Sequence, residues 1–291
     1  MNTASIPSAH SKFLDRALRL LRADQRFVGI AAAGSFTTGT MDEFSDIDLV
    51  IAVEPSEVET VSGERHHIAA GLGPLVAAFT GEHVGERRVL ICLYDGDGGG
   101  PPLHVDLKFV SLPDVAIRVD DLVVLWERDG RVTQALQMGE ARFPFPNPQW
   151  IEDRFWVWIH YGATKVGRGE LFEAVDFLAF LRSQVLGPLM LLEAGAQPSG
   201  VRRVETVAPS RAAELKATVA PYDAAACARS LYAAADLYRS LRHSLGPGRV
   251  VPNQSAEHAA LAYLDAITQR VSRGVSNAEQ PVAADGALRR R

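Results

Sequence analysis

Short apolar runs separated by turn residues fill the first half of the chain and predict the strands of a sheet. Residues 27–33 and 46–53 are mostly apolar and rich in Ile, Val and Ala, as in central strands covered on two faces. Residues 89–94 and 103–110 lie on either side of a loop rich in glycine and proline. Because such a loop is foreign to the interior of a helix or strand, these two segments are expected to form a hairpin.

Helical spacing of apolar residues also occurs in this half. Residues 11–21 carry apolar side chains three and four positions apart, which predicts an amphipathic first helix. Residues 66–79 predict a second helix, whose course is made irregular by two glycines and a proline. Residues 122–128, with Asp129-Gly130 and the three residues after them, predict a last strand that ends in a tight turn.

A proline-rich segment, Phe143-Pro-Phe-Pro-Asn-Pro, marks the change from strand to helix patterns. Asn147 is expected to cap the next helix, with Pro148 at its first position. The following helices are expected at residues 149–166, 170–194, 209–219, 223–245 and 255–271. We therefore expect an α+β protein with a sheet domain at residues 1–145, an all-helical bundle at 146–273 and a disordered tail at 274–291.

Composition and charge narrow the range of partners. The 291 residues include 47% hydrophobic residues, enough for two cores, and the formal net charge is −5. A chain without a basic field is not expected to bind long nucleic acid, whereas a cationic small molecule is electrostatically plausible. Cys92 and Cys227 are far apart and are expected to be buried free thiols.

The chain shows no signal-peptide core at its start, and no segment reaches about 18 uninterrupted apolar residues. The most apolar region, residues 177–194, is interrupted by Arg182 and Gln184. We therefore expect no membrane segment and a cytoplasmic protein.

Three aspartates are the strongest candidates for chemistry. Asp46 and Asp48 lie two apart on a predicted strand, so both carboxylates point to one face. Asp106 lies on a strand whose polar residues, His104 and Lys108 among them, alternate with apolar ones. Two close carboxylates are costly to bury unless a cation compensates them, and Mg²⁺ is the hard cation that carboxylates and phosphates share. If the two strands are neighbours, the three carboxylates predict a site for two metal ions.

Gly34-Ser35 follows the first apolar run and predicts a phosphate-binding turn. Glycine lets the backbone approach a ligand closely, exposed N–H groups favour anions, and Ser35 adds a hydroxyl donor. Taken alone, a Gly-Ser dipeptide is common in turns, and an Asp-x-Asp pair is expected about once by chance in a chain of this length. Their combination, a buried strand, Gly34-Ser35, ten residues and then Asp46-Ile-Asp48, is far more specific.

The segment from Gly34 to Ile51 resembles the signature of the DNA polymerase β-type nucleotidyltransferase superfamily, and the resemblance covers residues 10–115. It implies a small mixed sheet flanked by helices, two Mg²⁺ ions, a triphosphate on Gly34-Ser35 and a metal-binding triad of Asp46, Asp48 and Asp106. In that family the third aspartate often helps to deprotonate the acceptor hydroxyl, which would be the role of Asp106.

The order of a minimal catalytic domain and a helical bundle is similar to that of the antibiotic nucleotidyltransferases, which adenylylate aminoglycosides or lincosamides. In kanamycin-modifying members the bundle supplies a glutamate base and a lysine that contacts phosphate. Lys165 matches that lysine, but Tyr161 stands one turn earlier where a glutamate is expected. Asp106 is therefore the better candidate for the base.

The acidic residues Glu170, Glu173 and Asp176 recur every three positions and predict a wall for a cationic acceptor, although such a run is also typical of a solvated helix face.

Together these observations indicate an antibiotic-resistance type of adenylyltransferase that transfers AMP from ATP to a hydroxyl of a small molecule. Two alternatives stay open: an antitoxin-like transferase that modifies a protein, and a non-catalytic nucleotide-binding regulator. A transferase acting on tRNA is disfavoured by net charge alone.

Overall fold

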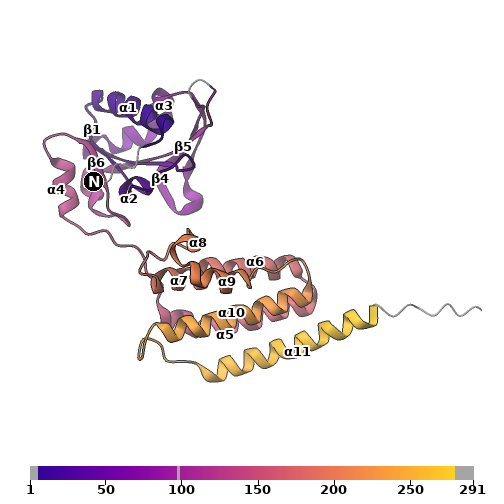
Figure 1. Ribbon diagram of the computed structural model, residues 1–291. Coiled ribbons are helices and arrows are strands. Elements are labelled where there is room, and N and C mark those ends of the chain that lie inside the picture. The colour runs from indigo at the N-terminus through magenta and orange to yellow at the C-terminus, as the bar shows by residue number, and fades with distance from the viewer. Residues whose placement is uncertain (1–5, 97–98, 279–291) are drawn as a thin grey trace, which may run out of the picture. The chain divides into compact units, whose positions relative to one another are not determined.

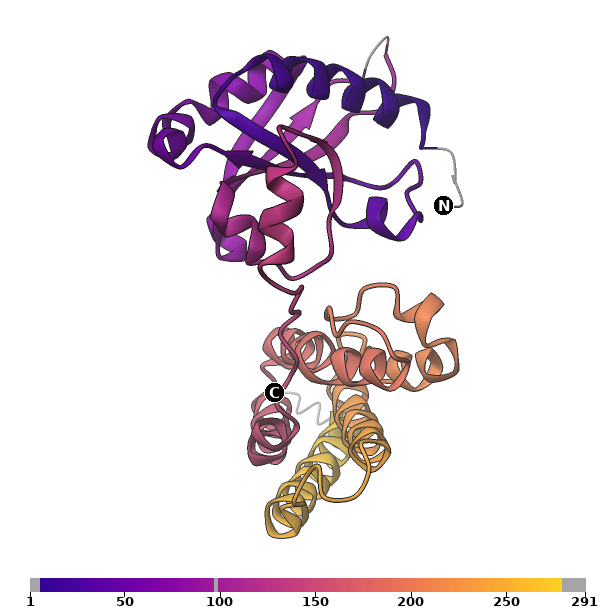
Figure 2. The same ribbon diagram turned by 90° about the vertical axis from the view of Figure 1, so that its left-hand side faces the viewer.

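The computed structural model describes residues 6–96 and 99–278, with side chains up to residue 273. The chain divides into two compact units, Met1–Phe143 and Pro144–Arg291, which are drawn in Figures 1 and 2. The expected α+β class, with a mixed sheet flanked by helices and a helical region after it, is confirmed. The division between Phe143 and Pro144 lies next to the domain boundary expected after residue 145. We propose that the two units are domains with separate roles.

The first unit contains one six-stranded sheet within the described residues, in the order β3-β4-β5-β2-β1-β6. β2 and β5 pair in parallel, and the other neighbours pair antiparallel. The elements of this unit, in chain order, are α1 (Ser8–Ala23), β1 (Phe27–Ala32), α2 (Ser35–Thr38), β2 (Ile47–Val53), η1 (Pro55–Glu57), α3 (Val58–Leu72), β3 (Leu75–Gly81), η2 (Glu82–Val84), β4 (Glu86–Tyr94), β5 (Leu103–Ser111), η3 (Leu112–Ala116), β6 (Val123–Glu127) and α4 (Arg131–Gln137).

The two faces of the sheet are covered differently. α1 and α3 pack on one face, where Phe13 and Val61 join the buried side chains of β1, β2, β4 and β5 in the main core. The other face carries a smaller core, in which Val115 of η3 and Val132 of α4 cover Val28 and Ala52. This second face leaves room for polar side chains beyond the smaller core.

Two elements of the first unit differ from the sequence prediction. The prediction of a helix at residues 66–79 is wrong in its second half, because α3 ends at Leu72 and β3 follows it. Pro74 explains the break, since proline cannot continue a helix and favours an extended residue before it. The residues after Asp129-Gly130 form α4 rather than the end of a strand, because both turn residues adopt a left-handed conformation that reverses the chain into a helix.

The second unit is helical in all its regular elements within the described residues. These elements are α5 (Pro148–Arg168), α6 (Leu171–Leu181), the π-helical turn η4 (Arg182–Leu186), α7 (Gly187–Glu193), α8 (Val204–Val207), α9 (Pro209–Lys216), α10 (Ala224–Ser244) and α11 (Gln254–Ala278). Asn147 caps α5 as expected, because its side chain accepts hydrogen bonds from the N–H groups of Gln149 and Trp150.

The long helix expected at residues 170–194 is three segments, α6, η4 and α7. Pro188 lacks the N–H that a helix interior needs, and a π turn just before a proline relieves the clash of its ring. α11 continues to Ala278, five residues past the expected end of the bundle. The remainder of the expected disordered tail, residues 279–291, lies outside the described residues.

The helical stretch Leu171–Glu193 is long and apolar enough to span a membrane by length and composition, with a mean hydropathy of 1.5. Arg182 and Gln184 interrupt this stretch, as expected, but its average composition still passes a test of length and hydropathy. Half of its most apolar window is buried inside the unit, where it contributes Leu178, Leu181 and Val185 to the bundle core. Core helices of soluble proteins share this composition.

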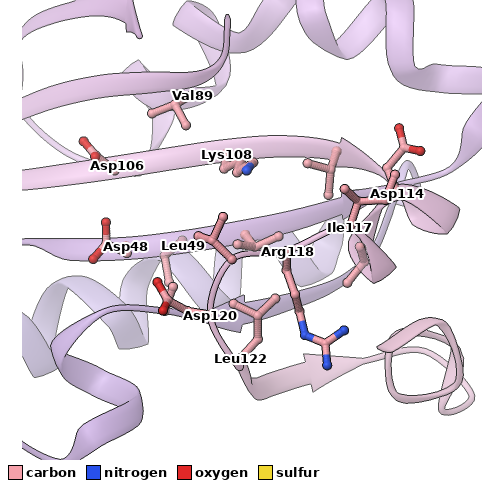
Figure 3. Close-up of a pocket in the computed structure, with 15 residues that line it drawn as sticks. Asp48, Leu49, Val89, Asp106, Lys108, Asp114, Ile117, Arg118, Asp120 and Leu122 are labelled. Carbon is pink, nitrogen blue, oxygen red and sulfur yellow. The ribbon is translucent and has the colours of Figure 1, made fainter. Parts of the chain in front are cut away.

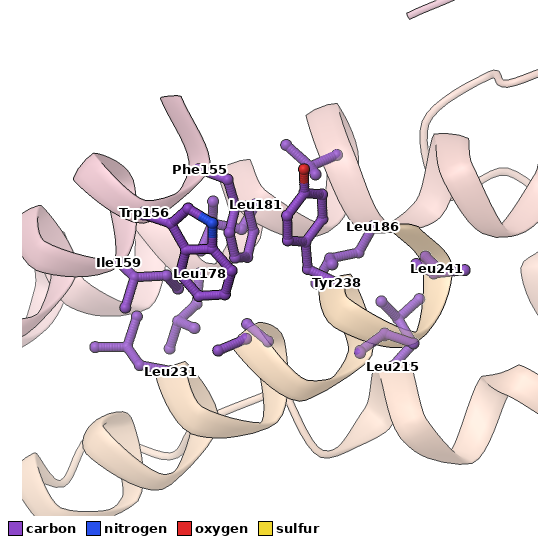
Figure 4. Packing of buried hydrophobic residues seen from close by; sticks show 14 of the residues in the cluster. Phe155, Trp156, Ile159, Leu178, Leu181, Leu186, Leu215, Leu231, Tyr238 and Leu241 are labelled. Carbon is purple, nitrogen blue, oxygen red and sulfur yellow. The ribbon is translucent and has the colours of Figure 1, made fainter. Parts of the chain in front are cut away.

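Aromatic and aliphatic side chains form the core of the bundle (Figure 4). Phe155 of α5 stacks on Tyr238 of α10, with ring centroids 3.8 Å apart, and Trp156 meets the same tyrosine edge-on. Phe155 and Trp156 are both fully buried, so they form part of this core and do not line a pocket. Cys92 and Cys227 are buried free thiols, as expected.

A buried carboxylate, Glu152, joins three parts of the bundle. It accepts hydrogen bonds from Trp156 Nε1 (3.0 Å), Tyr238 Oη (2.7 Å), Arg242 Nη1 (2.9 Å) and the N–H of Asn253 (2.8 Å). Burial opposes ionisation of this group, but these donors outweigh it and hold the pKa of Glu152 below its usual 4.5. The charged form is therefore part of the folded state.

Replacing Glu152 with Gln is expected to lower the free energy of unfolding by about 1–3 kcal/mol at pH 7, because Arg242 and its neighbours lose a charged acceptor. Since folding lowers the pKa of Glu152, its contribution is complete above about pH 4.5 and is lost as the pH falls further. Urea unfolding at pH 7 and pH 4 measures both effects. Asp153→Asn, an exposed change on the same helix, serves as the control and is expected to shift stability by under about 0.5 kcal/mol.

Candidate active site

Two of the predicted aspartates face each other across the parallel pair at the centre of the sheet. β2 and β5 pair in a register that sets Asp48 opposite Asp106. Their side chains line one pocket on the sheet face opposite α1 and α3 (Figure 3). Asp46 directly precedes β2, and its negative charge contributes to the titration of Asp106. The parallel register therefore gathers carboxylates from two strands on one surface.

Burial raises the pKa of Asp106 above its usual range, and the charge of Asp46 acts in the same direction. His104 opposes them, because its Nε2 lies 3.1 Å from Asp106 Oδ1. The side chain of Asp106 remains 27% exposed, so a ligand in the pocket can reach it.

Gly34 touches one of these carboxylates. Its φ of 61° and ψ of −136° belong to a backbone region that residues other than glycine rarely adopt. A Cβ at this position would lie 2.2 Å from Asp48 Oδ2. The end of β1 is tied to the same residue, since the N–H of Ala33 donates to the Asp48 carbonyl at 3.0 Å. The glycine turn and the carboxylate are therefore direct neighbours.

Ser35 follows this turn and begins α2. Its hydroxyl is buried and has no hydrogen-bond partner within residues 6–96 and 99–278. Buried hydroxyls are nearly always paired, so this one fits the binding of a polar ligand. Gly34 touches the Asp48 carboxylate and Asp46 acts on Asp106 through its charge, but of the five predicted residues only Asp48 and Asp106 line the pocket.

The pocket also contains charged residues that the sequence prediction did not select. Arg118 and Asp120 come from the segment after η3 and line the same pocket as Asp48. Lys108, two residues after Asp106, lies 2.9 Å from Glu86, and Arg88 and Lys108 lower the pKa of Glu86 to about 2. Alternation along β5 places Lys108 on the polar face, whereas no sequence spacing connects residues 118–120 to the aspartates.

The three predicted residues of the bundle form a separate cluster in the second unit. The ammonium group of Lys165 lies 2.8 Å from Glu170 and 3.0 Å from Glu173, and its side chain is only 12% exposed. Tyr161 donates a hydrogen bond to Glu173, and Lys165 lies over the Tyr161 ring. The hydrogen bonds to Glu170 and Glu173 raise the pKa of Lys165 well above its usual range.

The donor set of the first unit is suited to a divalent cation, because carboxylate oxygens are the ligands that hard cations prefer. Among the side chains described, no group of three or more His, Cys, Asp or Glu residues already has a metal-holding arrangement. Asp48 and Asp106 nevertheless share a strand register and a pocket, and the buried Ser35 hydroxyl points to a polar ligand beside them.

The mixed sheet, the glycine–serine turn and the paired aspartates are suited to binding a phosphate group and a divalent cation. The family model described as "Nucleotidyltransferase domain" matches residues 14–108. This part of the chain is a nucleotidyltransferase domain, and the expected superfamily is confirmed. Members of this family typically use divalent metals.

Chains similar to this one occur among the solved structures. An aminoglycoside 6-adenyltransferase from Bacillus subtilis is similar over 90% of this chain and 96% of its own, with 15% sequence identity and a TM-score of 0.32. No curated protein matches the chain.

Gly34→Ala is expected to reduce pyrophosphate release by about a hundredfold, because the new methyl group displaces the Asp48 carboxylate and strains the turn. A pyrophosphate assay with ATP and Mg²⁺ measures the loss. Gly85→Ala is the matched control, since Gly85 also has a positive φ but nothing within 4 Å of an added Cβ. Equal losses of activity in both variants would contradict a specific role for the Gly34 turn.

Proposed function

We propose that this nucleotidyltransferase transfers AMP from ATP to a hydroxyl group of a small-molecule acceptor and releases pyrophosphate. The observation that carries the proposal is the register of Asp48 with Asp106 on parallel strands, beside a turn whose glycine touches Asp48. Asp46, Asp48 and Asp106 are the residues that would hold two Mg²⁺ ions. When bound, these ions would neutralise the triphosphate and polarise its α-phosphate.

The phosphate chain is proposed to lie on the turn of Gly34 and Ser35. Backbone N–H groups at this turn favour an anion, and the unpaired Ser35 hydroxyl has a donor to offer. Holding the triphosphate here fixes the direction from which an acceptor oxygen can reach the α-phosphorus. Positioning of this kind supplies much of the rate enhancement in phosphoryl transfer.

Asp106 is the proposed proton acceptor. The acceptor oxygen forms a bond to the α-phosphorus, the bond from that phosphorus to the bridging oxygen breaks, and pyrophosphate leaves. The hydroxyl proton passes to the carboxylate of Asp106. Burial raises the pKa of Asp106, and a carboxylate with a raised pKa is a stronger base.

A small cationic acceptor, such as an aminoglycoside-like or lincosamide-like compound, is the proposed substrate class. The net charge of −5 supports it, as do Glu170 and Glu173 in the bundle. These two carboxylates already bind Lys165, so an acceptor would share them with that lysine. Cytoplasmic location, where ATP is abundant, belongs to the same proposal.

Labelled ATP, Mg²⁺ and panels of hydroxylated antibiotics and cellular proteins test the proposal together. AMP is expected on a small molecule, and labelling of a protein alone would support the protein-modifying alternative. Asp46→Asn and Asp48→Asn are each expected to lower the rate by at least about a hundredfold, because each removes a charge facing the triphosphate. Asp15→Asn, an exposed change on α1, is the control, and pyrophosphate release that survives in the Asp46 and Asp48 variants rules the mechanism out.

Lys165 is proposed to contact the nucleotide phosphate, and its replacement by Met separates this role from a structural one. A phosphate contact predicts that KM for ATP rises by about tenfold with a smaller change in kcat. Glu170→Gln removes one of its two carboxylate partners and is expected to leave KM for ATP unchanged or lower. A Lys165→Met variant that loses thermal stability but keeps its KM would show that the lysine only holds α5 and α6 together.

A further inference from the structure

A histidine lies buried in the otherwise apolar inner face of α1. His10 is 2% exposed and shares that face with Phe13, Leu14 and Ala17. Its Nε2 lies 2.7 Å from the carbonyl oxygen of Ser45. A carbonyl only accepts hydrogen bonds, so Nε2 carries the proton and donates.

The other ring nitrogen of His10, Nδ1, is buried and makes no hydrogen bond within residues 6–96 and 99–278. A buried polar atom left unpaired opposes folding, and an apolar residue at this place in α1 would avoid that penalty. Unlike an apolar residue, however, histidine can donate the hydrogen bond to the Ser45 carbonyl.

Ser45 ends a turn that is otherwise held by local bonds. Its hydroxyl donates to Asp42 Oδ1 at 2.9 Å, and its N–H donates to the Asp42 carbonyl at 3.2 Å. Phe44, the residue before Ser45, is 88% exposed, and its N–H donates to Asp42 Oδ1 within the same turn. The bond from His10 connects this turn to a different element, α1, 35 residues earlier in the chain.

The Ser45 carbonyl belongs to the same planar peptide unit as the N–H of Asp46. Holding the oxygen in place therefore restricts how that plane can rotate and where the Asp46 Cα can lie. Asp46 has no regular element of its own, because β2 begins at Ile47. We propose that His10 is a positioning residue, which holds Asp46 in the place where it binds a divalent cation.

The inference rests on the proposed function, since it takes Asp46 to be a cation ligand. His10 itself touches neither cation nor nucleotide. Its loss is therefore expected to weaken cation binding, with a smaller effect on ATP binding. A merely structural role in α1 would lower thermal stability instead and leave the cation dependence unchanged.

The test compares His10→Gln with His10→Asn in the full-length protein. Glutamine reaches the position of Nε2 with an amide N–H, whereas asparagine reaches only that of Nδ1 and is too short for the Ser45 carbonyl. His10→Asn is expected to raise the Mg²⁺ concentration for half-maximal pyrophosphate release by about tenfold, the size of one lost hydrogen bond. His10→Gln is expected to stay within about threefold of the wild type, because it keeps that bond.

Mn²⁺ binding gives a second readout that needs no turnover. It is measured as the loss of the electron paramagnetic resonance signal of the free ion. Leu21→Ala, a buried change at the far end of α1, is the control and is expected to lower the melting temperature without shifting the Mg²⁺ midpoint. Equal midpoints for wild type, Gln and Asn variants would overturn the role of His10. A wild-type protein that neither binds Mn²⁺ nor releases pyrophosphate would instead overturn the proposed function.

Discussion

The parallel pairing of β2 with β5 is the constraint on which the site depends. It brings together two strands separated by some fifty residues, and α3, β3 and β4 are the connection that this parallel arrangement requires. Side chains alternate along a strand, so a slip of one residue in β5 would turn Asp106 into the core and Leu107 into the pocket. The apolar side chains of β5 that pack under α3 therefore determine where the carboxylate lies.

Much of the fold could be predicted from local patterns. Apolar runs indicated β1, β2, β4 and β5, a glycine-rich loop indicated the hairpin, and Asn147-Pro148 indicated the start of α5. β3 and α4 could not be predicted in this way. β3 owes its strand state to pairing with β4, and α4 depends on how Gly130 turns the chain, and neither interaction is visible in a short window of sequence.

The candidate site could likewise be predicted from the sequence only in part. Residue types and spacing suggested Gly34, Ser35 and the aspartates, because strand periodicity places side chains two apart on one face. The approach of Gly34 to Asp48, the bond from His10 to Ser45 and the presence of Asp120 in the pocket depend on contacts between distant segments. In the bundle, the sequence prediction assigned Lys165 to phosphate and Glu170 and Glu173 to the acceptor, without showing that the lysine forms ion pairs with both carboxylates.

The contact between Gly34 and Asp48 also limits how this enzyme can change. A side chain at position 34 would displace the Asp48 carboxylate, because an added Cβ would lie 2.2 Å from Asp48 Oδ2. Residue 34 therefore cannot be enlarged without moving the carboxylate at position 48. Variation in the pocket is therefore expected at residues away from this contact, such as Val119 and Asp120, which also line it.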